Sequence, residues 1–211
     1  MKNKLILQPN TILPRRNKLA KLHFYYSAMN AGKSTSLLQS SYNYNERGMD
    51  TLLLTPAVDN RFGEKTIASR VGLTAGATAV SNTEDLYQLI ANALDKNSNI
   101  KCILVDEAQF LVKKQIQQLA YATDDFNIPV LAYGLRTDFM GEPFEGSKYL
   151  LALADQLIEL KTICHCGRKA TMVLRTDSAE NVLRDGAQVV IGGNDSYISV
   201  CRKHFREGKI K

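Results

Sequence analysis

The sequence has no long hydrophobic run. Its apolar stretches, such as residues 103–105 and 150–154, are far shorter than the ~20 residues that a membrane-spanning helix needs. Residues 5–7 are likewise too few for the core of a signal peptide, and no small-residue cleavage site follows them. We therefore predict a cytoplasmic protein that has no membrane partner.

Internal repeats, low-complexity tracts and extremes of composition are also absent. Hydrophobic residues make up 45% and charged residues 23% of the 211 residues, which excludes wholesale disorder, a collagen-like chain and a coiled coil. A chain of this length forms one domain, or one domain with a small appendage. The net charge of +6 suits an anionic ligand, but much of the excess lies at the two chain ends and does not by itself indicate a nucleic-acid partner.

Strand-like and helix-like segments alternate through most of the chain. We expect strands over 19–26, 51–55, 100–105, 128–133 and 156–160. We expect helices that begin at Ser34 and Thr83, the first ending near Gly48, and further helices over 112–122 and 147–154. This order predicts an α/β domain over 19–161, with a parallel sheet flanked by helices on both faces.

The two ends of the chain differ from this pattern. Residues 1–18 show no clear period, and we expect them to form a loose N-terminal extension. Short strand-like pieces at 172–175, 188–191 and 197–200 predict a small β-rich domain over 162–211 that ends in a basic tail.

A small-residue loop follows the first predicted strand and leads into the first helix. It reads Ser27, Ala28, Met29, Asn30, Ala31, Gly32, Lys33 and Ser34. Apart from Ser27 in the place of the first glycine, it matches the P-loop, in which backbone N–H groups and a helix N-terminus hold phosphate oxygens. We predict that Lys33 reaches the β- and γ-phosphates of ATP and that Ser34 binds Mg²⁺.

Two adjacent carboxylates end the third predicted strand, at the sheet edge where open α/β folds bind ligands. Asp106 is the predicted acid on the metal side, and Glu107 is placed to take a proton from an acceptor hydroxyl. Activation of water by Glu107, as in a plain ATPase, stays open at this point. The loop after the second strand adds Asp59 and Arg61, of which Arg61 is a candidate for stabilising phosphoryl charge.

Three of the four cysteines lie near histidines in the C-terminal part. Cys164 and Cys166 form a C-x-C pair, and Cys201 and His204 form a C-x-x-H pair. Three thiols and an imidazole make four ligands, which is the number that a tetrahedral, structural Zn²⁺ takes. Short predicted strands between the two pairs favour a ribbon-like zinc unit. His165 is a rival ligand to Cys166. Cys102 lies in an apolar run and is predicted to be buried.

Six blocks of the chain resemble the type II (cellular-type) thymidine kinases, in particular their bacterial branch. The blocks are residues 25–35, 105–110, 133–139, 164–170, 189–193 and 197–204. The resemblance implies transfer of the γ-phosphoryl group of ATP to the 5′-hydroxyl of thymidine with Mg²⁺, and with Glu107 as the proton acceptor. It also implies use of deoxyuridine, a homotetramer and feedback inhibition by thymidine triphosphate.

The resemblance also implies two sets of binding residues. A lasso loop of the zinc-bearing domain and apolar residues around it would hold the nucleoside: Met29, Leu135, Phe139, Gln188, Val189, Val190, Ile191, Gly192 and Tyr197. The nucleotide set comprises Ser27, Ala28, Met29, Asn30, Ala31, Gly32, Lys33, Ser34, Asp59, Arg61, Asp106, Glu107, Ala108 and Gln109.

Two other functions fit the sequence less well. A GTPase switch needs an N-K-x-D guanine-reading motif, and the Asn17-Lys18 pair lacks the aspartate and precedes the P-loop. A nucleic-acid-binding ATPase needs a basic stripe with interleaved aromatics. Tyr25 and Tyr26 lie instead in a predicted core strand, so no nucleic-acid partner is expected.

Overall fold

The computed structural model describes residues 19–57, 66–188 and 196–211. The predicted N-terminal extension, Asp59, Arg61 and the lasso residues 189–192 lie outside this range. None of the helices in the described part of the chain combines the length and the apolar character that a membrane span requires.

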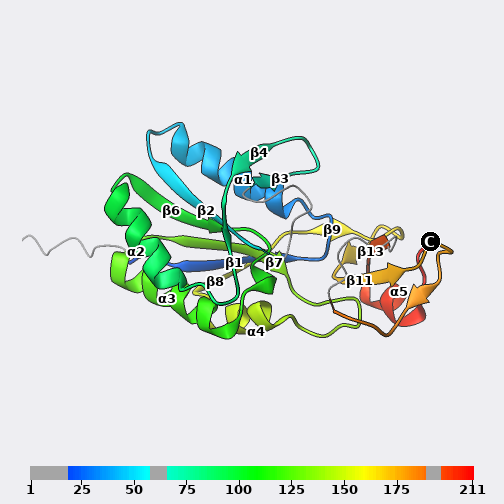
Figure 1. The fold of residues 1–211 in the computed structure, drawn as a ribbon. Helices are drawn as coiled ribbons and strands as arrows, with labels where there is room; N and C mark the ends of the chain where they lie inside the picture. Colours follow the sequence, from blue (N-terminus) through cyan, green and yellow to red (C-terminus); the bar gives the residue numbers. More distant parts are fainter. Residues whose placement is uncertain (1–18, 58–65, 189–195) are drawn as a thin grey trace, which may run out of the picture.

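A six-stranded parallel sheet forms the larger part of the molecule, as predicted (Figure 1). In spatial order its strands are β5 (Thr78–Val80), β2 (Asp50–Pro56), β6 (Ile100–Val105), β7 (Val130–Leu135), β1 (Leu22–Ser27) and β8 (Gln156–Glu159). Each neighbouring pair in this order is parallel. The carboxyl ends of β1, β6 and β7, which carry the predicted site residues, therefore meet at one edge of the sheet.

Helices cover both faces of the sheet, so its central strands are apolar on both sides. One face carries α1 (Lys33–Asn45) and the β3 (Thr66–Ala68) and β4 (Thr74–Gly76) hairpin, and the other carries α2 (Leu86–Lys96), α3 (Lys113–Phe126) and α4 (Glu145–Leu153) (Figure 1). Alternate residues of β6 point to opposite faces. Cys102 and Leu104 belong to the core under α1, and Ile103 and Val105 to the core under α2, α3 and α4.

Helices α2 and α3 differ at one end from their predicted positions. Helix α2 begins at Leu86 rather than at Thr83, because Asp85 is the N-cap and accepts a hydrogen bond of 3.0 Å from the backbone of Gln88. Helix α3 continues four residues past the predicted end at Ala122. There Thr123 turns its hydroxyl back onto the helix, donating to the carbonyl of Leu119 at 2.8 Å.

A small antiparallel unit follows the last strand of the parallel sheet. It contains β9 (Thr162–Ile163), β10 (Lys169–Ala170), β11 (Met172–Thr176), β12 (Val182–Leu183), β13 (Ser196–Val200) and the short helix α5 (Arg202–Glu207). Its largest sheet has the order β12–β11–β13, and β11 pairs antiparallel with both neighbours. We call this unit the appendage. It lies beyond one end of the parallel sheet (Figure 1).

The two faces of the β11–β13 sheet have different surroundings. Leu174, Ile198 and Val200 pack with Cys164 and Cys201 in a small core of the appendage itself. Val173 and Tyr197, on the opposite face, line a cavity shared with the parallel-sheet part of the chain. The appendage therefore uses one face for its own stability and the other to complete a cavity.

Candidate active site

The predicted phosphate loop follows β1 and leads directly into α1. Asn30 and Gly32 both have left-handed backbone conformations, with φ of 61° and 78°, so the chain curls between the strand and the helix. The ammonium of Lys33 lies within this curl. It donates to the hydroxyl of Ser27 at 3.3 Å and to the carbonyl of Ala28 at 3.2 Å. The fold thus places a buried cation, main-chain groups and a helix N-terminus together, as a phosphate site needs.

Asp106 lies beside this loop, although 72 residues separate it from Ser34. The hydroxyl of Ser34 donates to Oδ2 of Asp106 at 2.8 Å, and the backbone N–H of Glu107 donates to Oδ1 at 3.0 Å. Burial, and then the charge of Glu107, raise the pKa of Asp106 to about 7. A hydroxyl and a buried carboxyl in contact are oxygen ligands of the type that Mg²⁺ takes beside nucleotide phosphates.

Glu107 stands at a backbone bend directly after this strand. Its φ of 49° is left-handed, and it precedes the short 3-10 helix η1 (Ala108–Phe110). The side chain of Gln109 donates from Nε2 to Oε2 of Glu107 at 2.5 Å. The oxygen of the same amide accepts from the backbone N–H of Leu135 at 3.0 Å. Gln109 is 2% exposed, so it is a buried bridge between the carboxylate and the end of β7.

Two glycines leave space for the turn that contains Gln109, because a Cβ at either position would clash with this turn. A Cβ at Gly134 would lie 2.9 Å from Oε1 of Gln109 and 3.1 Å from its backbone nitrogen. A Cβ at Gly146, in α4, would strike the carbonyls of Leu111 at 2.8 Å and Gln109 at 2.9 Å. The turn that carries the carboxylate is therefore pressed against β7 on one side and α4 on the other.

A small, open cavity lies between the sheet edge and the appendage. It is lined by residues from both parts: Met29, Leu135, Thr137, Asp138, Phe139, Phe144, Val173, Gln188 and Tyr197. Five of these, Met29, Leu135, Phe139, Gln188 and Tyr197, are residues that the sequence predicts around a nucleoside. The phosphate loop contributes Met29 to the wall, so the cavity adjoins the predicted nucleotide site.

Buried charges hold the cavity wall in place. Asp138 is 3% exposed. Its Oδ1 accepts hydrogen bonds from the backbone N–H groups of Met140 at 2.8 Å and of Glu142 at 2.9 Å. Its Oδ2 accepts a hydrogen bond from Nε2 of Gln188 at 2.8 Å. The guanidinium of Arg175 lies over the ring of Phe139, 4.8 Å from its centroid.

Neither Asp138 nor Arg175 is among the residues that sequence reasoning selects. A signal existed for Arg175, which is the one charged residue in the segment 172–176. Asp138 is one of the residues of the 133–139 block.

The four predicted zinc ligands meet in the appendage. The ligand atoms of Cys164, Cys166, Cys201 and His204 all lie within 4.8 Å of one another. His165 is not part of this group; its ring instead stacks on that of His204 with centroids 4.2 Å apart. Three thiols and one imidazole at this spacing fit a closed tetrahedral zinc site.

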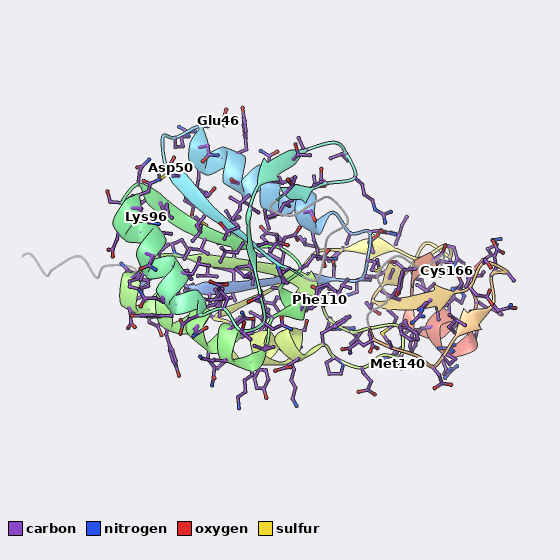
Figure 2. The ribbon with its side chains drawn as sticks, viewed as in Figure 1. Glu46, Asp50, Lys96, Phe110, Met140 and Cys166 are labelled. Atoms are coloured by element: carbon purple, nitrogen blue, oxygen red, sulfur yellow. The ribbon has the colours of Figure 1, made fainter. Side chains whose placement is uncertain are left out.

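The metal-ligand cluster belongs to the core of the appendage, to which Cys164 and Cys201 both contribute. In Figure 2, Cys166 lies in the appendage, well separated from Phe110 at the end of η1. The cluster is therefore placed to hold the appendage together rather than to contact transferring phosphate.

The chain is similar to thymidine kinases along most of its length. A family model described as thymidine kinase matches residues 20–205. A thymidine kinase of Coxiella burnetii is 64% identical over 191 residues, which cover 90% of this chain and 97% of the relative. Thymidine kinases of Shewanella oneidensis and Yersinia pseudotuberculosis are 61% and 60% identical over 189 residues, covering 90% of this chain and 98% and 96% of the relatives.

Proposed function

Because this chain belongs to the thymidine kinase family and is an ATP-dependent thymidine kinase, we propose that the phosphate loop holds the donor and the cavity holds the acceptor. The division is supported by the position of Met29, which belongs to the phosphate loop and also lines the cavity. It places donor and acceptor side by side at the carboxyl edge of the parallel sheet.

The donor half consists of the loop 27–34 and the carboxyl of Asp106. Main-chain N–H groups and Lys33 bind the phosphates of ATP. Ser34 and Asp106 would hold Mg²⁺, which neutralises charge on the phosphates when it is bound. Asp106 is buried and in contact with Ser34, so a bound cation would stabilise its charged form.

Glu107 is the proton acceptor in this proposal. The 5′-hydroxyl of thymidine gives its proton to the carboxylate of Glu107 while its oxygen bonds to the γ-phosphorus and the bond from that phosphorus to ADP breaks. The observation that carries this role is the Gln109 bridge. It fixes the carboxylate of Glu107 to the backbone of Leu135, whose side chain lines the acceptor cavity.

Gln109 then acts by orienting Glu107 and not by contacting the nucleotide. The contacts of its side-chain amide with Glu107 and Leu135 support this change from the sequence-based assignment. The nucleotide roles of Asp59 and Arg61 stay proposals that rest on their place in the loop after the second strand. The lasso role of residues 189–192 stays a proposal that rests on the resemblance.

The cavity supports an apolar site for the thymine methyl group. Met29, Leu135 and Phe139 provide the apolar wall. An apolar pocket distinguishes one methyl group by only about 1–3 kcal/mol, so we propose that deoxyuridine is also a substrate.

The remaining proposals concern the metal and the assembly. Cys164, Cys166, Cys201 and His204 would hold a structural Zn²⁺ that joins the two ends of the appendage. Residues 19–161 form the nucleotide-binding domain and 162–211 the zinc-binding domain. A cytoplasmic homotetramer with feedback inhibition by thymidine triphosphate follows from the family resemblance.

A coupled assay of ADP formation tests the acceptor assignment. The purified chain is given ATP and Mg²⁺ with thymidine, deoxyuridine, deoxycytidine or no acceptor. We expect fast turnover with thymidine, slower turnover with deoxyuridine, and only background ADP without a nucleoside. Equal ADP formation with and without nucleoside would instead show that Glu107 activates water.

A further inference from the structure

A hydrogen bond connects the appendage directly to the phosphate loop. The hydroxyl of Ser199, on β13, donates to the main-chain carbonyl of Met29 at 2.6 Å, across 170 residues of sequence. Other contacts also link the appendage to the parallel-sheet part. Arg136 donates to the carbonyl of Thr171 at 3.3 Å, Lys169 pairs with Glu159 at 2.6 Å, and Gln188 donates to Asp138 at 2.8 Å. None of these contacts is made by residues 27–34.

The fold explains why this carbonyl points outward. When successive backbone N–H groups turn inward to hold an anion, the carbonyls between them turn to the outside of the loop. A carbonyl in such a partly buried position needs a hydrogen-bond donor. Ser199 provides that donor from the appendage, so the outer surface of the phosphate loop is held by the other part of the molecule.

The position of Ser199 on its strand is set by packing. Ile198 and Val200 on either side of it face the core of the appendage. Side chains alternate along a strand, so Ser199 and Tyr197 share the opposite face. Tyr197 lines the acceptor cavity, and its neighbour across the strands is Arg175, which lies over Phe139. One face of β13 therefore contacts both the acceptor cavity and the donor loop.

We propose that Ser199 is a positioning residue for phosphoryl transfer, which sets the distance between the donor loop and the acceptor cavity by holding the carbonyl of Met29. This inference rests on the proposed division of donor and acceptor sites. Ser199 touches neither the phosphates nor the nucleoside, and it acts through Met29 and Tyr197. Transfer rates depend steeply on alignment, and a displacement of about 1 Å can cost a factor of about 100.

A pair of variants of equal shape tests the hydroxyl itself. Threonine and valine are both β-branched and suit a strand, but only threonine keeps a hydroxyl donor. We expect Ser199→Thr to retain at least about half of the wild-type kcat and Ser199→Val to lose about tenfold. In both variants the separately measured Kd values for ATP and thymidine should stay within about twofold of the wild type, because the binding groups remain.

Three controls separate this role from a structural one. Ser196→Ala removes an exposed hydroxyl from the same strand and should leave kcat unchanged. Zinc content should equal that of the wild type in every variant, since Ser199 lies two residues from Cys201. The melting temperature should not differ between the Thr and Val variants by more than a few degrees.

The outcomes are distinct. A kcat that is lower in Ser199→Val than in Ser199→Thr, with unchanged Kd values, supports the positioning role. Equal kcat values in the two variants overturn it, as does a loss confined to thymidine affinity. If the wild type itself shows no preference for thymidine over no acceptor, the division of sites fails, and that result comes from the unmodified chain alone.

Discussion

The side-chain amide of Gln109 joins the carboxylate of Glu107 to the backbone of Leu135. It donates to Oε2 of Glu107 at 2.5 Å and accepts from the N–H of Leu135 at 3.0 Å. Glu107 itself has a left-handed backbone conformation and directly precedes a short 3-10 turn. The bridge connects its carboxylate to the wall of the cavity in which we place the nucleoside.

Replacement of the proton acceptor should separate binding from chemistry. In Glu107→Gln we expect kcat to fall by about 10²–10⁴, the usual contribution of a general base, while the Kd for ATP stays within about threefold. The measurement is steady-state phosphorylation together with equilibrium binding of ATP. Glu46→Gln, at the far end of α1, is the matched control (Figure 2). Turnover that survives the change at Glu107 would remove this residue from the base role.

Loss of the bridge should lower turnover more than binding. Gln109→Ala removes the side chain that connects the carboxylate of Glu107 to the backbone of Leu135. We expect kcat to fall about tenfold, while the Kd values for ATP and thymidine stay within about threefold, because the phosphate loop and the cavity wall remain. The exposed Gln39→Ala on α1 serves as the control. A loss that appears in the Kd values as strongly as in kcat would contradict an orienting role and indicate general destabilisation.

The four cysteines should divide into two classes when they are alkylated at pH 8. With one zinc per chain bound, Cys164, Cys166 and Cys201 are protected as metal ligands, and they should react once the zinc is chelated. Cys102 should stay unlabelled in both states. It is fully buried, and burial raises its pKa to about 12, so almost no thiolate exists at pH 8. Mass spectrometry reads out both classes.

Two independent results would contradict the roles assigned to the cysteines. A protein that contains no zinc and is fully active would contradict the structural metal site. Rapid labelling of Cys102 in the zinc-bound protein would contradict its place in the core beneath α1. Denatured protein provides the reference in which all four thiols react.

The apolar wall of the cavity should decide how well the thymine methyl group is recognised. Leu135→Ala enlarges the cavity but keeps the backbone N–H that Gln109 binds. We expect kcat/KM for thymidine, divided by kcat/KM for deoxyuridine, to fall about 5- to 10-fold, because the variant loses apolar contact with one methyl group. Leu153→Ala, 43% exposed at the end of α4, is the control. An unchanged ratio would place the methyl group elsewhere.

The sequence predicted the parallel sheet well because its strands carry strong local signals. Residues 100–105 read as a strand from composition alone and form β6, buried on both faces. The short β3, β4, β5, β9, β10 and β12 escaped prediction. Each has only two or three residues, and their pairing depends on partners that are distant in sequence or supplied by a turn. Helix ends shifted where a side chain such as Asp85 capped the backbone.

The site was predictable in its chemical groups but not in their contacts. Lys33, Asp106 and Glu107 follow from a loop motif and from acids at the end of a buried strand. The zinc set follows from residue type and number. The bridge made by Gln109 and the bond from Ser199 to Met29 could not be read from the sequence, because each joins residues from separate elements and depends on three-dimensional packing. The same holds for the anchoring of Gln188 by Asp138.

Gly146 has a consequence for how this enzyme tolerates genetic change. It carries no reacting group and lies in an ordinary helix, yet any larger residue there would push against the main chain of the turn behind Glu107. Cells that depend on an external supply of thymidine should therefore lose viability through substitutions at this codon as readily as through changes in the reactive carboxylate. A map of deleterious alleles would mark α4 as part of the catalytic apparatus even though none of its side chains takes part in the reaction.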